Sequence, residues 1–344
     1  MSVQRAIQIQ GPKVAKLVTD APIPALRPNH VRVKTVAVAL NPADWKSVDY
    51  LGEPGLISGC DYSGIVEEVH PSVTHLRVGD KIAGLTHGAN ALNRTDGAFA
   101  EHIVVKAALC SKVPDSMTME EAATLGAGVT TVAQGLYQTL RLPWPTAPTP
   151  DPFPVLVYGG STATGTLAIQ FAKLSGCEVL ATCSPHNFEL VRRLGADHVF
   201  DYRTPGVGRE IRDAAGGRLA HVLDCISSPA SAAICAEAIG SEGGKYSTLV
   251  PVNDFPRDDV TVSLGIAYTA FGEEFRKGDT VTPAKPEDFE FAARFWKTAE
   301  ELLAQGKIKS HPPEVRNGGL GGILDGMEDM RQEKVSGVKL VYKV

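Results

Sequence analysis

The sequence has 344 residues, of which 43% are hydrophobic and 21% charged, and its formal net charge is −5. A chain of this length and composition is expected to form about two globular domains. The negative net charge gives no electrostatic basis for binding nucleic acid or an anionic membrane surface. No apolar run approaches the roughly 20 residues of a membrane span, and the opening MSVQRAIQIQGPK lacks the apolar core of a secretory signal. We therefore expect a cytoplasmic protein.

Cysteine usage agrees with that compartment. The six cysteines are scattered without a CxxC pair, which is typical of reduced cytosolic thiols rather than of a disulfide framework or a zinc cluster. They are Cys60, Cys110, Cys177, Cys183, Cys225 and Cys235.

The first part of the chain consists of short β-like runs separated by Gly and Pro, which is typical of a mainly antiparallel β domain. Strands are expected at 30–40, 63–70, 81–85 and 98–113. A helix is expected at 116–125, where Ser116 or Thr118 can cap the first turn, and another at 128–140, where apolar residues recur at helical spacing.

The stretch RLPWPTAPTPDPFP (141–154) contains six prolines and is expected to be an extended connection, because proline suits neither a helix interior nor a central strand. The alternative is a proline-rich ligand for a partner. After it, strand-like and helix-like runs alternate, which predicts a parallel, doubly wound sheet. The tail is expected to hold a long helix at 288–306 and a final strand, VSGVKLVYKV, that returns to the first domain.

The segment VLVYGGSTATGTLAIQFAK has the order strand, glycine turn, helix, which presents backbone N–H groups and a helix dipole to a pyrophosphate. Gly160 and Gly165 take the outer positions of a GxGxxG pattern, and Thr162 stands at the middle one. We expect the hydroxyls of Ser161, Thr162 and Thr164 to donate hydrogen bonds there. A plain Gly-rich turn is the alternative.

The next strand ends in TCSPHN (182–187) without the acid that binds the ribose 2′-hydroxyl in NAD-binding folds. A carboxylate would repel a 2′-phosphate, whereas Ser184 and Asn187 can donate hydrogen bonds to one. Tyr202 and Arg203, at the end of the following strand, can reach the same place. This favours NADPH over NADH. As an alternative or in addition, Ser184 or Asn187 caps the helix that begins at Phe188.

These motifs resemble the medium-chain dehydrogenase/reductase superfamily over nearly the whole chain. The resemblance rests on NPADWK (41–46), GCDYSGIVEEV (59–69), VGDKIAG (78–84), DGAFAEHIVV (96–105), MEEAATL (119–125) and the LVYGGSTATG loop. It implies an α/β architecture: a GroES-like β-barrel substrate domain at 1–140 and 271–344, a Rossmann NADPH-binding domain at 141–270, and a substrate that binds in the cleft between them.

Zinc alcohol dehydrogenases of that superfamily carry a Cys and a Gly-His-Glu at matching places. Here Cys60 and Asp61 replace the His-Glu, and 41–44 contain no cysteine. This lacks a first shell for Zn²⁺, so no metal site is expected. We expect Asp61 to be a hydrogen-bonded structural acid.

The narrower resemblance is to the trans-acting enoyl reductases of fungal polyketide clusters, through GGSTAT, TCSPHN, FDYR and KVSGVKLVY. It implies hydride transfer from NADPH to the Cβ of an α,β-unsaturated acyl thioester on the acyl carrier protein of a polyketide synthase or synthase–peptide synthetase hybrid, by a monomer without a metal. Two alternatives remain: a free-standing NADPH-dependent quinone or alkenal oxidoreductase, and a cofactor-dependent binding or scaffold protein.

The same resemblance assigns the site residues. Lys46 is the first choice for the charged group that orients NADPH or supplies a proton, and Thr131 is the second catalytic candidate, through a hydrogen bond to the substrate carbonyl. Tyr50 is a minor candidate acid. The cofactor residues are Ala43, Asp44, Trp45, Lys46, Gly160, Ser161, Thr162, Ala163, Thr164, Ser184, Pro185, His186, Asn187, Tyr202, Leu249, Val250, Val335 and Ser336. The substrate residues are Gly128, Val129, Thr130, Thr131, Val132, Ala133, Gln134, Gly135, Thr269, Ala270, Phe271, Gly272 and Glu273.

Overall fold

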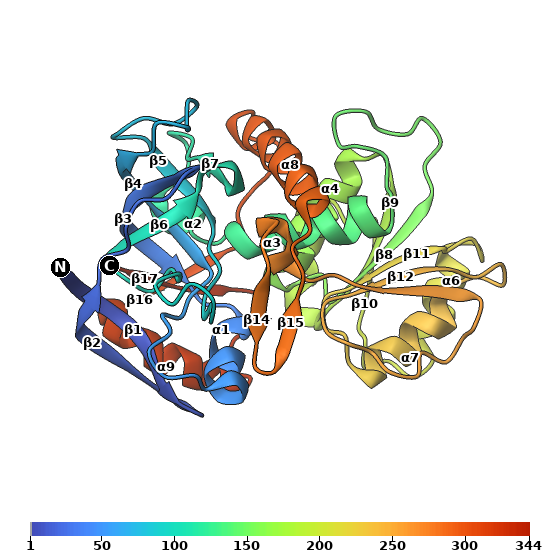
Figure 1. Ribbon diagram of the computed structural model, residues 1–344. Coiled ribbons are helices and arrows are strands. Elements are labelled where there is room, and N and C mark those ends of the chain that lie inside the picture. Colours follow the sequence, from blue (N-terminus) through green and yellow to red (C-terminus); the bar gives the residue numbers. More distant parts are fainter. Residues whose placement is uncertain (1) are drawn as a thin grey trace. The chain divides into compact units, whose positions relative to one another are not determined.

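The computed structural model describes residues 2–344 and divides into two compact units (Figure 1). Unit 1 comprises Met1–Thr130 and Tyr268–Val344, and unit 2 comprises Thr131–Ala267. The boundaries therefore fall at 130/131 and 267/268, where the sequence predicted 140/141 and 270/271. In the described residues no helix is long and apolar enough to cross a membrane.

Unit 1 is built on a sheet with the strand order β16-β17-β3-β4-β5-β7, in which β6 also pairs with β3. Apart from the parallel pair β16–β17, its pairings are antiparallel. The last strand of the chain pairs with β3, so it returns to the first part of the chain as predicted. Two separate two-stranded ribbons, β1-β2 and β14-β15, complete the unit. The strands are β1 (Val3–Gly11), β2 (Val14–Pro22), β3 (His30–Ala39), β4 (Asp61–Val69), β5 (Lys81–Leu85), β6 (His102–Lys106), β7 (Cys110–Lys112), β14 (Phe275–Lys277), β15 (Thr280–Thr282), β16 (Pro313–Arg316) and β17 (Lys339–Lys343).

The core of unit 1 forms where the alternating strands turn their apolar residues inward, as a period of two requires. Val31 and Val33 of β3 pack there with Ile7 of β1 and with Ile323 and Met327 of α9. Figure 1 shows α9 beside β1 and β2. The helices and helical turns of this part of the chain are α1 (Pro42–Lys46), η1 (Ser47–Leu51), η2 (Ala107–Leu109), α2 (Met119–Ala122), α3 (Gly126–Val132), η5 (Ala267–Phe271), α8 (Pro286–Ala304) and α9 (Gly319–Arg331).

Unit 2 has one sheet of six parallel strands in the order β10-β9-β8-β11-β12-β13. In chain order within the unit this is 3-2-1-4-5-6, the strand order of a Rossmann fold, and the order reverses between β8 and β11. The prediction of a doubly wound parallel sheet is confirmed. Its elements are η3 (Ala133–Thr139), β8 (Pro154–Tyr158), α4 (Ala163–Leu174), β9 (Glu178–Thr182), η4 (Pro185–Asn187), α5 (Phe188–Arg193), β10 (His198–Phe200), α6 (Val207–Ala214), β11 (His221–Asp224), α7 (Pro229–Ala238), β12 (Gly244–Thr248) and β13 (Val260–Leu264).

Helices cover both faces of this sheet: Figure 1 shows α4 on one side and α6 and α7 on the other. Ile211 of α6 and Cys235 of α7 pack with Leu156, Val222 and Tyr246 of the strands. The proline-rich stretch 141–154 forms no helix and reaches a strand only at its last residue, as its composition predicts. All six cysteines are free.

Candidate active site

The glycine turn of unit 2 lies between β8 and α4, at the carboxyl end of the sheet beside the point where the strand order reverses. Gly159 N–H donates to Thr182 Oγ1 at 3.0 Å, and Gly160 N–H donates to the Thr182 carbonyl at 2.8 Å. Ala163 and Thr164 are the first residues of α4, so their N–H groups have no partner inside the helix by geometry. The turn can therefore offer two N–H groups and the positive end of a 12-residue helix to a pyrophosphate.

Two glycines of this loop are required by close packing. A Cβ on Gly165 would lie 2.3 Å from the Gly159 carbonyl oxygen, so only glycine allows α4 to start this close to the turn. Gly159 has a φ of +78°, which L side chains rarely adopt. The Thr162 hydroxyl donates to the Gly159 carbonyl and accepts from Gly165 N–H, both at 2.9 Å. The single proton of the Thr162 hydroxyl is thus used in a hydrogen bond within the loop. Of the three predicted side-chain donors, the half-buried Ser161 and Thr164 remain available to a ligand.

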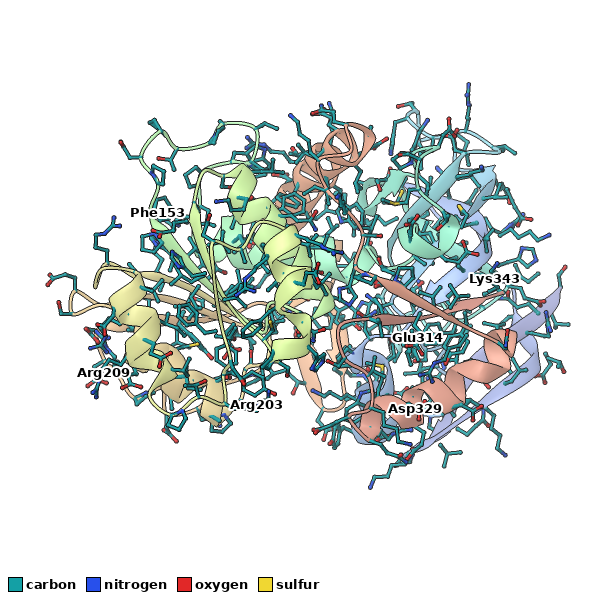
Figure 2. All side chains as sticks on the ribbon, turned by 180° about the vertical axis from the view of Figure 1, so that it is seen from behind. Phe153, Arg203, Arg209, Glu314, Asp329 and Lys343 are labelled. Carbon is teal, nitrogen blue, oxygen red and sulfur yellow. The ribbon has the colours of Figure 1, made fainter. Side chains whose placement is uncertain are left out.

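The second strand of unit 2 ends in neutral side chains. Ser184 is half-buried, and its Oγ lies 3.5 Å from the exposed Tyr202 hydroxyl. Neither Ser184 nor Asn187 makes a side-chain capping hydrogen bond, so the capping alternative is not used here. Arg203 is at the surface (Figure 2) and makes two hydrogen bonds to Asp201, of 3.0 and 3.1 Å. No motif in the sequence indicated a role for Asp201, which takes up much of the Arg203 charge.

The loops that follow β11 and β12 are tied together by one buried carboxylate. Asp224 Oδ1 accepts from the N–H groups of Ile226 and Ser227, and its Oδ2 accepts from the Tyr246 hydroxyl at 2.6 Å. Ser227 Oγ in turn accepts from Leu249 N–H at 2.9 Å. Leu249 and Val250, assigned to the nicotinamide end, are thus held against β11, and the Val250 carbonyl accepts from Thr248.

In unit 1 the NPADWK motif forms the short helix α1. Asp44 is 2% exposed, and its Oδ2 accepts from Asn41 N–H at 2.7 Å, which fixes the start of the turn. Burial raises the pKa of Asp44 to about 7. Lys46 is exposed, its Nζ lies 5.7 Å from the Trp45 ring centroid, and within residues 2–344 it makes no hydrogen bond or ion pair. Its charge is therefore available to a ligand.

The positions that match a zinc site hold other interactions. Asp61 Oδ1 accepts from Ala127 N–H at 2.6 Å, while its Oδ2 is ion-paired with Lys339 Nζ. Lys339 also donates to Asn41 Oδ1 at 2.9 Å. Asp61 is thus the hydrogen-bonded structural acid that the sequence predicted. In the described residues no group of three His, Cys, Asp or Glu side chains could hold a metal. With a lysine ammonium on Asp61, these side chains do not fit Zn²⁺.

A cluster that the sequence analysis missed surrounds Tyr268. Its hydroxyl is hydrogen-bonded to Cys60 Sγ at 3.0 Å, and its ring stacks on His87 with the centroids 4.1 Å apart. Lys277 Nζ, at the end of β14, lies 4.0 Å from the Tyr268 ring centroid, within cation–π range. Burial lowers the pKa of His87 well below its ordinary value, so the ring is neutral. Within residues 2–344 Lys277 makes no hydrogen bond or ion pair, and His87 Nε2 has no partner.

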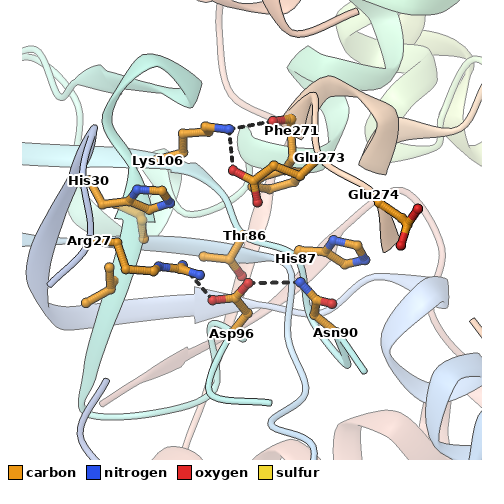
Figure 3. Close-up of a pocket in the computed structure, with 12 residues that line it drawn as sticks. Arg27, His30, Thr86, His87, Asn90, Asp96, Lys106, Phe271, Glu273 and Glu274 are labelled. Carbon is orange, nitrogen blue, oxygen red and sulfur yellow. Dashed lines mark hydrogen bonds and ion pairs between the residues drawn. The ribbon is translucent and has the colours of Figure 1, made fainter. Parts of the chain in front are cut away.

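A buried lysine anchors the segment that carries Tyr268 (Figure 3). Lys106 of β6 is 8% exposed and donates to the Phe271 carbonyl and to Glu273 Oε1, the latter at 2.6 Å. Nearby, in the same small pocket, Arg27 pairs with Asp96 at 2.7 Å. Burial raises the pKa of Asp96 to about 6 although Arg27 opposes this. Phe271 and Glu273, predicted as substrate contacts, have their polar groups engaged with Lys106.

The predicted substrate segment 128–135 is helical and buried except for the half-buried Thr131. Thr130 Oγ1 accepts from the Trp296 indole N–H at 3.0 Å, so its side chain braces α8. Gln134 donates to the Ile266 carbonyl at 3.2 Å. Thr131 is the one residue of this segment with a partly exposed side chain. In the tail Val335 is half-buried and Ser336 is exposed.

Comparison with known proteins identifies the fold and the superfamily. One family model, described as alcohol dehydrogenase GroES-like domain, matches residues 27–115, and another, described as zinc-binding dehydrogenase, matches 163–248. The crystal structure of CurK enoyl reductase superposes with a TM-score of 0.79 at 20% identity, covering 99% of both chains. Together with the unit 2 sheet, these likenesses define a medium-chain dehydrogenase/reductase.

Comparison with curated relatives identifies a particular family within this superfamily. The chain is 48% identical to trans-enoyl reductase ACTTS2 of Alternaria alternata, with 100% of both chains covered. It is 45% identical to trans-enoyl reductase resD of Aspergillus sclerotiorum, over 99% of this chain and 100% of that one. It is 48% identical to trans-enoyl reductase TOXD of Cochliobolus carbonum, over 83% of this chain and 96% of that one. The chain belongs to the family of fungal trans-enoyl reductases.

Proposed function

We propose that this protein is a trans-acting enoyl reductase that uses NADPH to reduce the α,β-unsaturated acyl thioester of a growing polyketide. The substrate is carried by the acyl carrier protein of a partner synthase that the reductase serves from a separate chain. The names of the full-length relatives support the reaction and the partner. The Rossmann order of unit 2, with its glycine turn at the strand ends, supports a nicotinamide cofactor.

The observation that carries the chemistry is the closed zinc position. Asp61 is ion-paired with Lys339 and Cys60 is hydrogen-bonded to Tyr268, so both residues at the positions that match a zinc site are engaged in other contacts. Alcohol oxidation by a zinc enzyme needs the metal to hold an alkoxide, whereas hydride addition to a conjugated thioester needs a donor for the thioester oxygen and a proton for Cα. Zinc-independent reduction of an activated alkene fits these residues.

The choice of NADPH rests on the end of the second strand. Ser184 and Tyr202 place two neutral hydroxyls there, and no carboxylate stands at the positions 182–187. Such donors suit a 2′-phosphate, which an acid would repel. When bound, NADPH supplies the hydride. The start of α4 would hold its pyrophosphate, and Lys46, which is exposed, is the charged group predicted to orient it.

The experiment is a rate measurement with purified protein. NADPH oxidation at 340 nm is followed with a crotonyl or longer enoyl thioester, first on a pantetheine analogue and then on an acyl carrier protein, and in parallel with a free quinone and a free enone. Reduction of the thioester with higher kcat/KM than either free substrate supports the proposal. Turnover of the quinone or enone alone would establish the free-standing oxidoreductase instead, and NADPH binding without turnover of any of them would establish a binding protein.

The monomeric state remains a prediction and is tested by light scattering. Within unit 2 the outermost strand β13 leaves Val262 and Leu264 38% and 41% exposed. A measured mass of two chains would contradict the monomer and would direct attention to that edge.

A further inference from the structure

Reduction of an enoyl thioester needs a proton donor, and the residues named for that role from the sequence are Lys46 and Tyr50. Lys46 is exposed, Tyr50 is 74% exposed, and within residues 2–344 neither side chain makes a hydrogen bond or an ion pair. Tyr268, in contrast, is 9% exposed and is held from several directions by Cys60, His87 and Lys277. A general acid can act only when it is held within reach of the atom that it protonates. The position of the Tyr268 hydroxyl is therefore the first requirement, and its pKa is the second.

The Tyr268 hydroxyl lies near residues of unit 1 that are assigned to the cofactor and to the substrate. It is bonded to Cys60, and Cys60 lies beside Asp44: burial and then the Asp44 charge raise the pKa of that thiol well above its ordinary value. Asp44 belongs to the segment 43–46 assigned to the cofactor, and Tyr268 directly precedes the segment 269–273 assigned to the substrate. The hydroxyl therefore lies beside Cys60 and close enough to Asp44 for that charge to act on it, and it belongs to the residue just before the substrate segment.

Burial raises the pKa of Tyr268 well above its ordinary value, so a phenolate formed there needs a stabilising positive charge nearby. The Lys277 ammonium lies 4.0 Å from the ring centroid and has no carboxylate of its own within residues 2–344, so its charge is not neutralised by a partner. It is held at the end of β14 by a two-residue loop in which Gly278 has a φ of +55° and Lys277 pairs with Thr280. Burial lowers the pKa of Lys277.

We propose that Tyr268 is the catalytic acid that protonates Cα of the substrate, and that Lys277 is a positioning residue that stabilises the phenolate this leaves. The assignment rests on the proposed function and extends it by naming the proton donor. Hydride addition at Cβ moves the alkene electron pair to Cα and the thioester oxygen, giving an enolate. The Tyr268 O–H bond then breaks, the Cα–H bond forms, the C=O double bond is restored, and a phenolate remains. Water returns the proton to Tyr268 before the next turnover.

The test compares Tyr268→Phe with the wild type. The variant keeps the ring that stacks on His87 and removes only the hydroxyl. We expect kcat with an enoyl thioester to fall roughly 10²- to 10⁴-fold, the range for loss of a general acid, while the Kd for NADPH, measured by fluorescence titration, is unchanged. With 4-deuterated NADPH in D₂O, the wild type should give one relative configuration at Cα and Cβ, read from the proton coupling. The variant should give both, because water can reach either face.

Matched variants separate the alternatives. Tyr62→Phe removes a hydroxyl from another buried tyrosine of unit 1 and should leave kcat and configuration unchanged. Lys277→Met should lower kcat about tenfold and shift the pH profile while KM for the thioester holds. A Tyr268→Phe enzyme that keeps the wild-type kcat and the single configuration would overturn the assignment, as would loss of the configuration in Lys46→Met alone. The wild-type rate tests the proposed function, whereas the ratio of variant to wild type tests Tyr268, so the two failures are distinct.

Discussion

Lys339 and Asp61 form an ion pair that is almost closed to solvent, with 3% and 0% of their side chains exposed. The two residues are 278 positions apart, so the pair fastens the last strand of the chain to the start of β4. The same ammonium donates to Asn41 Oδ1, at the start of the NPADWK motif. This contact links β17 to β4, two strands that both pair with β3, and it places a salt bridge where a metal ligand would stand in a zinc enzyme.

Lys339→Met is expected to destabilise the protein by about 3–5 kcal/mol, because it leaves the Asp61 carboxylate buried without its counter-charge. Urea denaturation followed by circular dichroism measures the change. Lys343→Met is the matched control: Lys343 is on the same strand, but its side chain is 67% exposed in its pair with Glu120. That control should cost no more than about 1 kcal/mol. Equal losses in the two variants would show that burial of the Asp61 pair has no special weight.

Gly165→Ala tests the phosphate loop. A Cβ at this position would lie 2.3 Å from the Gly159 carbonyl oxygen, so the turn must shift. We expect a loss of about 1–3 kcal/mol in stability, as for other overpacked sites, and a marked loss of NADPH affinity. Gly265→Ala, in the same unit, meets nothing closer than 3.8 Å and should change neither quantity. Unaltered NADPH affinity in Gly165→Ala would mean that this turn does not hold the pyrophosphate.

Much of this fold could be predicted from the sequence because many of its elements are indicated by local patterns of residues. Short apolar runs and Gly turns indicate the alternation of β8, α4, β9 and the following elements. The strands predicted at 30–40, 63–70 and 81–85 are present with shifts of at most a few residues, whereas the strand predicted at 98–113 is divided into β6 and β7 by the turn η2. β13 escaped notice because it follows an irregular, charged stretch and is exposed along much of its length. β1, β2 and the β14–β15 hairpin were likewise not predicted.

The candidate site was predicted unevenly for the same reason. The glycine turn and the neutral strand end are contiguous motifs, so residues such as Gly160 and Ser184 could be named in advance. Tyr268 and Cys60 are 208 positions apart, and Trp296 and Thr130 are 166 apart. Contacts of this range depend on tertiary packing and leave no periodicity to read. His87 belongs to no recognisable motif in the sequence. Only the structure, in which the Tyr268 ring stacks on it, indicates that it is part of a cluster.

Ser184→Asp tests the preference for a phosphorylated ribose. The new carboxylate would stand beside the Tyr202 hydroxyl, where the 2′-phosphate is expected to bind. We predict that the Kd for NADPH rises about 10- to 100-fold, from the ~1–4 kcal/mol that two like charges about 4 Å apart cost near a surface. The Kd for NADH should change little or fall. Ser241→Asp adds the same charge to an exposed position of unit 2 and serves as the control. A uniform loss for both nucleotides would contradict the assignment of Ser184 to the phosphate.

Asp44 should make stability fall as the pH rises through the acid range. Burial raises its pKa from 3.8 to about 7 in the folded protein, so between these values the folded state holds a proton that the unfolded state has released. Stability then decreases with pH, at up to about 1.4 kcal/mol per pH unit from this group, and levels off above pH 7, where both states are ionised. Asp44→Asn removes the titration but keeps an acceptor for Asn41 N–H. The unfolding free energy of the wild type minus that of Asp44→Asn, measured from pH 4 to 8, should therefore decline up to about pH 7 and then stay flat. A difference that is constant over this range would show that Asp44 titrates normally and that its burial does not govern its charge.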